Sequence, residues 1–157
     1  MKFTQTLAFL VVATFLIQYF LVSIVTTSNP MYIRHSLGKF YLSLVVAFSI
    51  GIIEIMIHDI SYDTRSVNKY FVMLALLILS IIAYRNQIFV TDDQYLNQMI
   101  ENKSVQQLED EEILKKTHSY GVTRMAKLSV QNTQEDINKM IRLLNAQKDL
   151  KKVQFGN

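Results

Sequence analysis

The sequence predicts an all-α membrane protein with three transmembrane helices followed by a C-terminal helical hairpin. Half of the 157 residues are hydrophobic. Three stretches in the first 90 positions, residues 3–33, 40–53 and 70–84, contain no charged side chain. Beyond residue 91 the chain is polar, and its apolar residues recur at steps of three and four, which is the spacing of a helix with one buried face.

Charge divides the chain at the same place. Residues 1–91 hold six Lys/Arg and three Asp/Glu, whereas residues 92–157 hold ten of each. This balance lacks the excess of clustered Lys/Arg that marks a nucleic-acid-binding surface, so we expect no nucleic-acid partner. Cysteine is absent, which excludes disulfides, thiolate metal sites and cysteine nucleophiles. We therefore expect a membrane domain over residues 1–91 and a polar helical hairpin domain with a basic tail over residues 92–157.

The first predicted span covers about residues 7–27. A helix needs about 20 apolar residues to cross roughly 30 Å of hydrocarbon, and the polar content here is Gln18 with some hydroxyl groups. A cleaved signal peptide is the alternative, but its apolar core is only about 7–15 residues long and a small-residue cleavage site should follow it. We favour a retained helix that ends at Ser28, Asn29 and Pro30, because proline lacks the N–H group that continues a helix.

The second predicted span covers about residues 40–57 and the third about residues 70–90. Aromatic and basic residues at the ends of the third span suit the membrane interface: Tyr70, Tyr84 and Arg85. The Lys/Arg residues near the span ends divide almost evenly between the two sides, so the positive-inside rule discriminates little. We favour a cytoplasmic location for the C-terminal domain.

The hairpin domain is predicted from its helix signals. Thr91 and Gln94 have the spacing of a capping box, so a helix should start there and run to about Lys116. Residues 117–121 indicate a turn before a second helix. Its apolar stripe needs a surface to cover it, such as a partner chain, the membrane or a second copy. We therefore predict a partner-docking face on this helix, formed by Val122, Ala126, Val130, Ile137, Met140 and Leu144.

Glu54 and His58 are the best candidate site within the spans. A spacing of four places them on one helix face, and ionisable groups at membrane depth suggest a functional role such as proton transfer or ion binding. The alternative is structural, because both residues lie in the last turns of the second span, where they can reach the headgroups or pair with Lys69 or Arg85.

No motif predicts an enzyme, a cofactor or a metal site. His35 and His118 lie far from other ligands in the sequence, and no phosphate-binding loop or nucleophile elbow is present. The acidic run of residues 109–112 lacks the alternating ligands of a calcium loop. The basic tail, with Lys148, Lys151 and Lys152, could touch anionic lipid if the domain is cytoplasmic.

Short motifs follow one another from the second span to the second helix of the hairpin: Lys39-Phe40-Tyr41, Tyr62, Asn68, Arg85-Asn86-Gln87, Asp92, Tyr95-Leu96, Met99-Ile100, Met125-Ala126 and Asp136-Ile137 with Met140. Over residues 38–144 this order resembles the membrane-anchored branch of the domain-of-unknown-function 305 family. The resemblance implies a ferritin-like helical fold, and the family's histidines and methionines are associated with copper.

The residues that the family would use as ligands are absent. Asn102 and Lys103 stand in place of the paired histidines, Glu109 in place of a methionine, and Thr133 in place of a glutamine. The spans carry Val45, Val46 and Ile50 instead of methionine-rich faces. An ammonium group cannot coordinate a metal while protonated. The resemblance therefore implies the helical fold of the family without its metal-binding residues.

We expect a non-enzymatic integral membrane protein that serves as a structural or accessory subunit of a membrane-associated assembly. Its partners would be the lipid bilayer and one or more proteins, without a cofactor. A virion membrane protein that links an internal bilayer to a shell is one form of this hypothesis, which nothing in the residues selects. The alternatives are a copper-handling membrane protein and a small transporter or ion-conducting subunit that uses Glu54 and His58.

Overall fold

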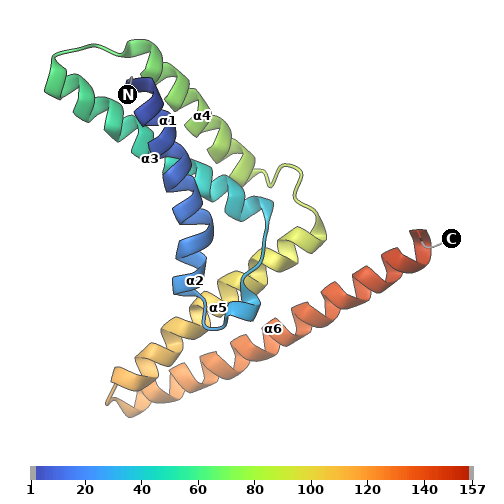
Figure 1. Ribbon diagram of the computed structural model, residues 1–157. Coiled ribbons are helices and arrows are strands. Elements are labelled where there is room, and N and C mark those ends of the chain that lie inside the picture. The colour runs from blue at the N-terminus through green and yellow to red at the C-terminus, as the bar shows by residue number, and fades with distance from the viewer. Residues whose placement is uncertain (1–2, 156–157) are drawn as a thin grey trace. The chain divides into compact units, whose positions relative to one another are not determined.

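The computed structural model describes residues 3–155, which form helices joined by short loops, and it contains no strand within that range. The chain divides into two compact units. The first unit consists of Met1–Val22 and Leu37–Val90, and the second consists of Ser23–Ser36 and Thr91–Asn157. Figure 1 shows the elements in order along the chain. The predicted fold class is confirmed: three helices long and apolar enough to span a membrane precede a helical hairpin.

The first spanning stretch, Phe3–Thr26, is helical throughout but not uniform. It consists of α1 (Phe3–Leu16), a π-helical turn (Ile17–Leu21) and α2 (Val22–Thr26). In the π-helical turn the N–H of Val22 donates to the carbonyl of Ile17, five residues earlier. Such a wide turn inserts one residue into the helix without breaking it.

The other two spans differ from their predicted bounds. Helix α3 (Leu37–Tyr62) extends beyond the predicted span of about 40–57 at both ends, because the helix also includes flanking polar residues such as Lys39, His58 and Asp59. Helix α4 (Val67–Arg85) ends five residues before Val90. The chain turns sharply after it, with positive φ angles of 48° at Gln87 and 59° at Phe89, and a helix cannot contain such residues.

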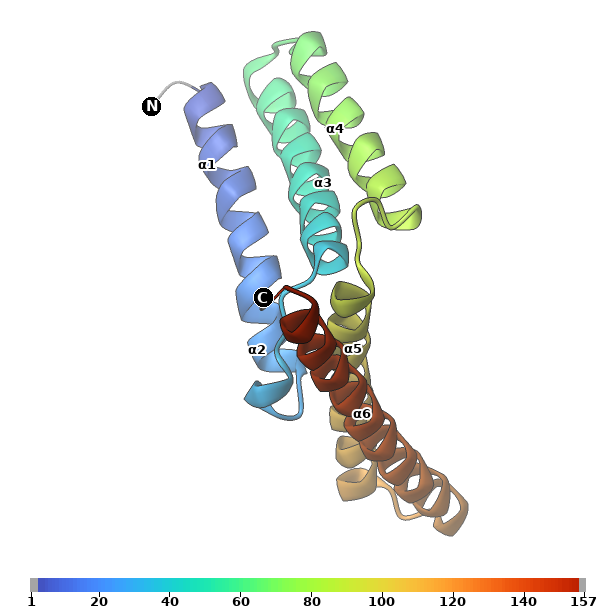
Figure 2. The same ribbon diagram turned by 90° about the vertical axis from the view of Figure 1, so that its right-hand side faces the viewer.

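Helix α3 is the centre of the first unit and packs against both α1 and α4 (Figure 2). Its buried stripe is made of small residues four apart, Ser43, Ala47 and Gly51. A Cβ atom added at Gly51 would lie 3.0 Å from Val11 Cγ2 on α1 and 3.4 Å from Met73 Sδ on α4. In lipid, helices associate through such close van der Waals contacts rather than through the hydrophobic effect, so this stripe allows α3 to hold two neighbours.

Hydroxyl groups within the spans are satisfied locally. The Oγ atoms of Ser43, Ser49 and Ser80 each donate to the carbonyl four residues earlier, at 2.8–2.9 Å. Hydrocarbon offers no water to replace such a bond. These serines therefore fit spanning helices without requiring a polar partner.

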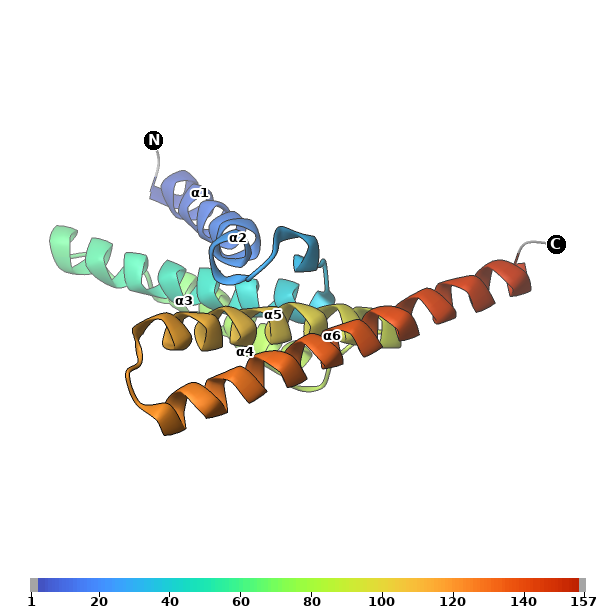
Figure 3. The same cartoon turned by 90° about the horizontal axis from the view of Figure 1, so that it is seen from below.

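The second unit is an antiparallel hairpin of α5 (Asp92–Lys116) and α6 (Tyr120–Phe155), seen from below in Figure 3. The predicted capping box is confirmed: Thr91 Oγ1 accepts from the N–H of Gln94 at 3.4 Å, and the N–H of Thr91 donates to Gln94 Oε1 at 3.3 Å. From Ala146 onward, where we predicted a basic tail, α6 continues as helix to Phe155.

Candidate functional site

Glu54 and His58 lie on one face of α3, in keeping with their spacing of four, and they line the same open groove. The groove has a volume of about 520 Å³, and its other lining residues are Phe3, Thr6, Ile57, Ser61 and Tyr62. Within residues 3–155 no hydrogen bond or ion pair joins Glu54 to His58. The two groups thus share a polar groove but do not form a coupled pair.

The ring of His58 is held by aromatic neighbours. Its centroid lies 3.6 Å from that of Phe3 in a stacked arrangement and 4.8 Å from that of Tyr62. Its Nδ1 atom lies 3.5 Å from Asp59 Oδ1. The ammonium of Lys69, at the start of α4, lies 4.1 Å above the Phe3 ring, which is a cation–π distance. Residues from all three spans therefore meet around His58.

Asp59 is a structural residue that the sequence reasoning missed. Its Oδ1 atom accepts from Thr64 Oγ1 at 2.9 Å, and its Oδ2 atom accepts from the N–H of Ser66 at 2.6 Å. These bonds tie the last turn of α3 to the loop before α4. The available signal was an aspartate followed by hydroxyl residues, a pattern typical of turns.

Aromatic residues mark the other end of the spans. Phe40 of α3 lies edge-on to Phe15 of α1 at 5.1 Å, and Lys39 lies 4.9 Å from the ring of Tyr19 in the π-helical turn. The hydroxyl of Tyr41 donates to the carbonyl of Ile88 at 2.8 Å. This belt of rings and cations suits a membrane–water interface.

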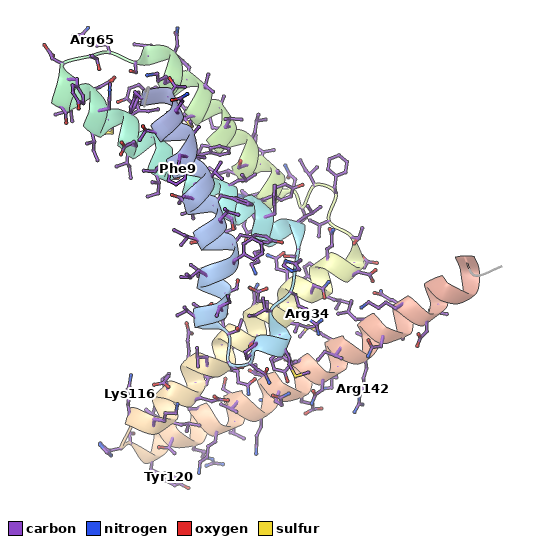
Figure 4. All side chains as sticks on the ribbon, in the orientation of Figure 1. Phe9, Arg34, Arg65, Lys116, Tyr120 and Arg142 are labelled. Carbon is purple, nitrogen blue, oxygen red and sulfur yellow. The ribbon has the colours of Figure 1, made fainter. Side chains whose placement is uncertain are left out.

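A buried polar seam on α5 is the main feature that the sequence did not reveal. Glu101, Ser104 and Gln107 stand three residues apart on one face of α5 and are buried. The loop between the first two spans lies against them: Ser28 bonds to Ser104 Oγ at 2.9 Å through its hydroxyl and at 3.1 Å through its N–H. The N–H of Arg34, which is labelled in Figure 4, donates to Glu101 Oε2 at 3.0 Å.

This seam gives structural roles to the segment that resembles a metal-binding motif. Glu101 and Ser104 bind the loop, and Lys103 forms an ion pair of 3.3 Å with Asp136 of α6. Among residues 3–155 no group of three or more His, Asp or Glu is arranged to hold a metal ion. His35 and His118 lie on the surface.

The predicted partner-docking face is mostly used inside the hairpin. Ala126, Ile137 and Leu144 are buried, Val130 and Met140 are half-buried, and only Val122 is exposed. Ile137 and Leu144 form a core with Ile100 of α5, against which Tyr32 of the loop packs. The sequence did not predict that this loop belongs to the hairpin unit. The loop buries part of the apolar face of α6 that we predicted a partner protein would bury.

Four of the exposed apolar side chains of this unit lie near the hairpin turn, on the last turn of α5 and the first turns of α6. We call Ile113, Tyr120, Val122 and Met125 the turn patch; Tyr120 is 83% exposed and Met125 75% exposed. A shallow, open depression with a volume of about 310 Å³ lies beside it, lined by Glu112, Ile113, Lys116, Thr117 and Val122. Lys115 donates to Glu112 at 2.7 Å, and this bond lowers the pKa of the Glu112 carboxyl. Figure 4 labels Lys116 and Tyr120 at this turn.

These features fit a membrane protein with three helices that could span a bilayer, followed by a helical hairpin domain. No family model and no solved structure matches the chain. It is similar to an uncharacterized protein of Acanthamoeba polyphaga mimivirus, with 27% identity over 146 residues that cover 92% of this chain and 94% of that protein. The similarity therefore extends over nearly the whole length of both proteins.

Proposed function

We propose that this chain is a non-enzymatic structural or accessory subunit of a membrane-associated assembly, which docks onto a protein partner through its hairpin domain. The turn patch is the observation that carries the proposal. Tyr120 and Met125 are large, apolar and mostly exposed, in a domain that buries the apolar face of α6 within its own hairpin. Clustered exposed apolar residues of this kind are typical of interaction sites.

The surroundings of the patch favour a protein as the ligand. The shallow depression beside Val122 and Ile113 provides an open surface on which an apolar side chain of a partner can lie. Lys115 and Lys116 flank it, and their charges are partly satisfied by Glu112 at 2.7 and 3.6 Å. An apolar centre with a charged, solvated rim is the usual arrangement of a protein–protein interface.

The attachment of the hairpin also suits a docking role. The chain enters this unit from the first span, leaves it through Ser36 to the second, and returns from the third at Thr91. Hydrogen bonds to Ser104 and Glu101 hold the segment between the first and second spans against α5. A partner bound to the turn patch is thereby linked to the membrane through three spanning helices, which is what an anchoring subunit requires.

Site-specific photocrosslinking tests the proposal. A photoreactive amino acid at Met125 of the full-length protein, in the membranes of its source organism, is expected to capture one protein that mass spectrometry can identify. The matched control is Asn132, which is also exposed on α6 but lies outside the patch. The same capture at both positions, or no captured protein at Met125, would overturn the proposal.

Proton or ion movement is a second candidate function, favoured by the groove that Glu54 and His58 share. Glu54→Gln should then abolish transport by reconstituted vesicles without changing the amount of protein. Asp63, which is exposed in the loop after α3, provides the control substitution Asp63→Asn. Equal transport by the wild type and Glu54→Gln would rule this function out.

The resemblance to a copper-associated family remains a prediction. Stoichiometric copper or zinc in the purified protein would favour metal handling over a docking role. The cytoplasmic location of the hairpin is likewise a proposal. Because the chain has no cysteine, a single cysteine introduced at Asn132 and labelled with a membrane-impermeant reagent would establish its side.

A further inference from the structure

The C-terminal end of α6 runs past the helix that it packs against. Helix α5 has 25 residues and α6 has 36. Lys103 pairs with Asp136 and Asp110 with Ser129, and this antiparallel register places Asp92, the first residue of α5, opposite Gln147. Residues 148–155 therefore extend beyond the start of α5, as the red end of α6 shows in Figures 1 and 3.

This end of α6 exposes an apolar stripe. Leu143 is 56% exposed and Leu150 is 67% exposed. Ala146 is also exposed and lies between them, so the three residues occupy positions i, i+3 and i+7 of one helix face. The adjacent face contributes Leu144 to the hairpin core, so the exposed stripe points away from α5. Among the residues whose side chains the structure describes, the stripe therefore remains largely uncovered.

The same segment is strongly basic. Between residues 142 and 155 the sequence contains four Lys/Arg and one Asp. Arg142 and Lys148 are exposed, and Figure 4 labels Arg142. A helix with an apolar stripe and an excess of cations is typical of segments that lie in the headgroup region of an anionic bilayer.

The chain connection places a bilayer within reach of this segment. The third span ends at Arg85 and α5 begins at Asp92, so six residues, 86–91, separate them. Even fully extended, the seven steps from Arg85 to Asp92 span at most about 25 Å. The stripe lies at the same end of the hairpin as Asp92, because Gln147 is opposite Asp92 in the register described above. The turn patch lies at the other end.

We propose that residues 142–155 of α6 bind the anionic lipid surface of the bilayer that holds the three spans. Leu143 and Leu150 insert at the boundary between headgroups and acyl chains, and Arg142 and Lys148 contact lipid phosphates. This binding is independent of partner docking, which uses the opposite end of the hairpin. It gives the hairpin a second attachment to the membrane besides its covalent connections.

The absence of tryptophan from the chain makes a direct test possible. Leu150→Trp introduces a single fluorophore into the stripe, and Leu128→Trp places the control fluorophore at a half-exposed position toward the hairpin turn. Each full-length variant is reconstituted into vesicles of phosphatidylcholine, with or without phosphatidylglycerol. Brominated lipids then report contact with acyl chains. Both leaflets have the same composition, so the orientation of insertion does not affect the result.

We expect Leu150→Trp to emit at shorter wavelength and to be quenched by brominated lipid, more strongly in vesicles that contain phosphatidylglycerol. Leu128→Trp should be unaffected. Adding Arg142→Glu and Lys148→Glu should weaken the quenching severalfold, since each cation near an anionic surface contributes about a fivefold preference. Arg124→Glu with Lys127→Glu, near the turn, is the matched control and should have no effect.

Two results would overturn the proposal. Water-like, unquenched emission from Leu150→Trp in anionic vesicles would show that the stripe is free in solution. Short-wavelength emission that brominated lipid does not quench would show that protein covers it instead. Neither result bears on the photocrosslinking at Met125, so the lipid proposal and the docking proposal can fail separately.

Discussion

Replacement of Gly51 tests the central packing feature of the membrane unit. Gly51 faces two helices at once, and its missing side chain allows α1 and α4 to approach α3 on both sides. A Cβ atom there would lie 3.0 Å from Val11 Cγ2 and 3.4 Å from Met73 Sδ. Carbon atoms at optimal separation are about 3.5–4.0 Å apart, so the first contact is too short by roughly 0.5–1 Å.

The size of the added side chain sets the expected effect. Gly51→Ala requires the Val11 side chain to shift by about half an ångström, and the cost is offset by the helix preference of alanine over glycine, about 1 kcal/mol. Its stability should therefore change little. Gly51→Leu adds three further carbons between the helices, and overpacking of this kind costs about 1–3 kcal/mol or more.

Denaturation in mixed micelles, followed by circular dichroism, measures this difference. The matched control is Gly121→Leu, because a Cβ atom at Gly121 meets nothing within 4 Å. The control should unfold at the same denaturant concentration as the wild type or slightly above it, and Gly51→Leu well below it. Equal denaturation midpoints for the two leucine variants would refute the inference that α1 and α4 pack closely against α3 at Gly51.

Three further predictions concern the hairpin unit. Ile137→Ala should destabilise it by about 2–5 kcal/mol, because Ile137 is fully buried and alanine leaves a cavity; thermal unfolding measures this, and a change below 1 kcal/mol would contradict the assigned core. Ser104→Ala removes the hydroxyl that accepts from the N–H of Ser28, so limited trypsin digestion should cleave more rapidly after Arg34; unchanged cleavage would show that the seam does not hold the loop. Lys115 lowers the pKa of Glu112, so their pair stabilises the folded chain at neutral pH and its contribution is lost as the pH falls through the Glu112 pKa. Lys115→Gln should raise that pKa in an NMR titration, and an unchanged value would exclude the pairing.

The candidate site was only partly visible in the sequence. The spacing of Glu54 and His58 sufficed to place both on one face of α3, since helical periodicity is a local property. Their surroundings were not predictable, because Phe3 comes from another helix more than fifty positions away. The turn patch was predicted only at Val122, for the same reason: Val122 shares an apolar pattern with Ile137, and only the helix opposite decides which of them is covered.

The sequence by itself determined the three spanning helices and the start of α5. Lipid cannot satisfy backbone hydrogen bonds, so a long uncharged stretch has to be helical, and a capping box acts over only four residues. Tertiary structure alone decided that the loop at Ser28 belongs with α5, because Ser28 and Ser104 stand 76 positions apart. It also decided that Ile137 and Leu144 face inward while Leu143 and Leu150 remain exposed. An apolar pattern shows which residues favour burial, but the residues that bury them come from distant parts of the chain.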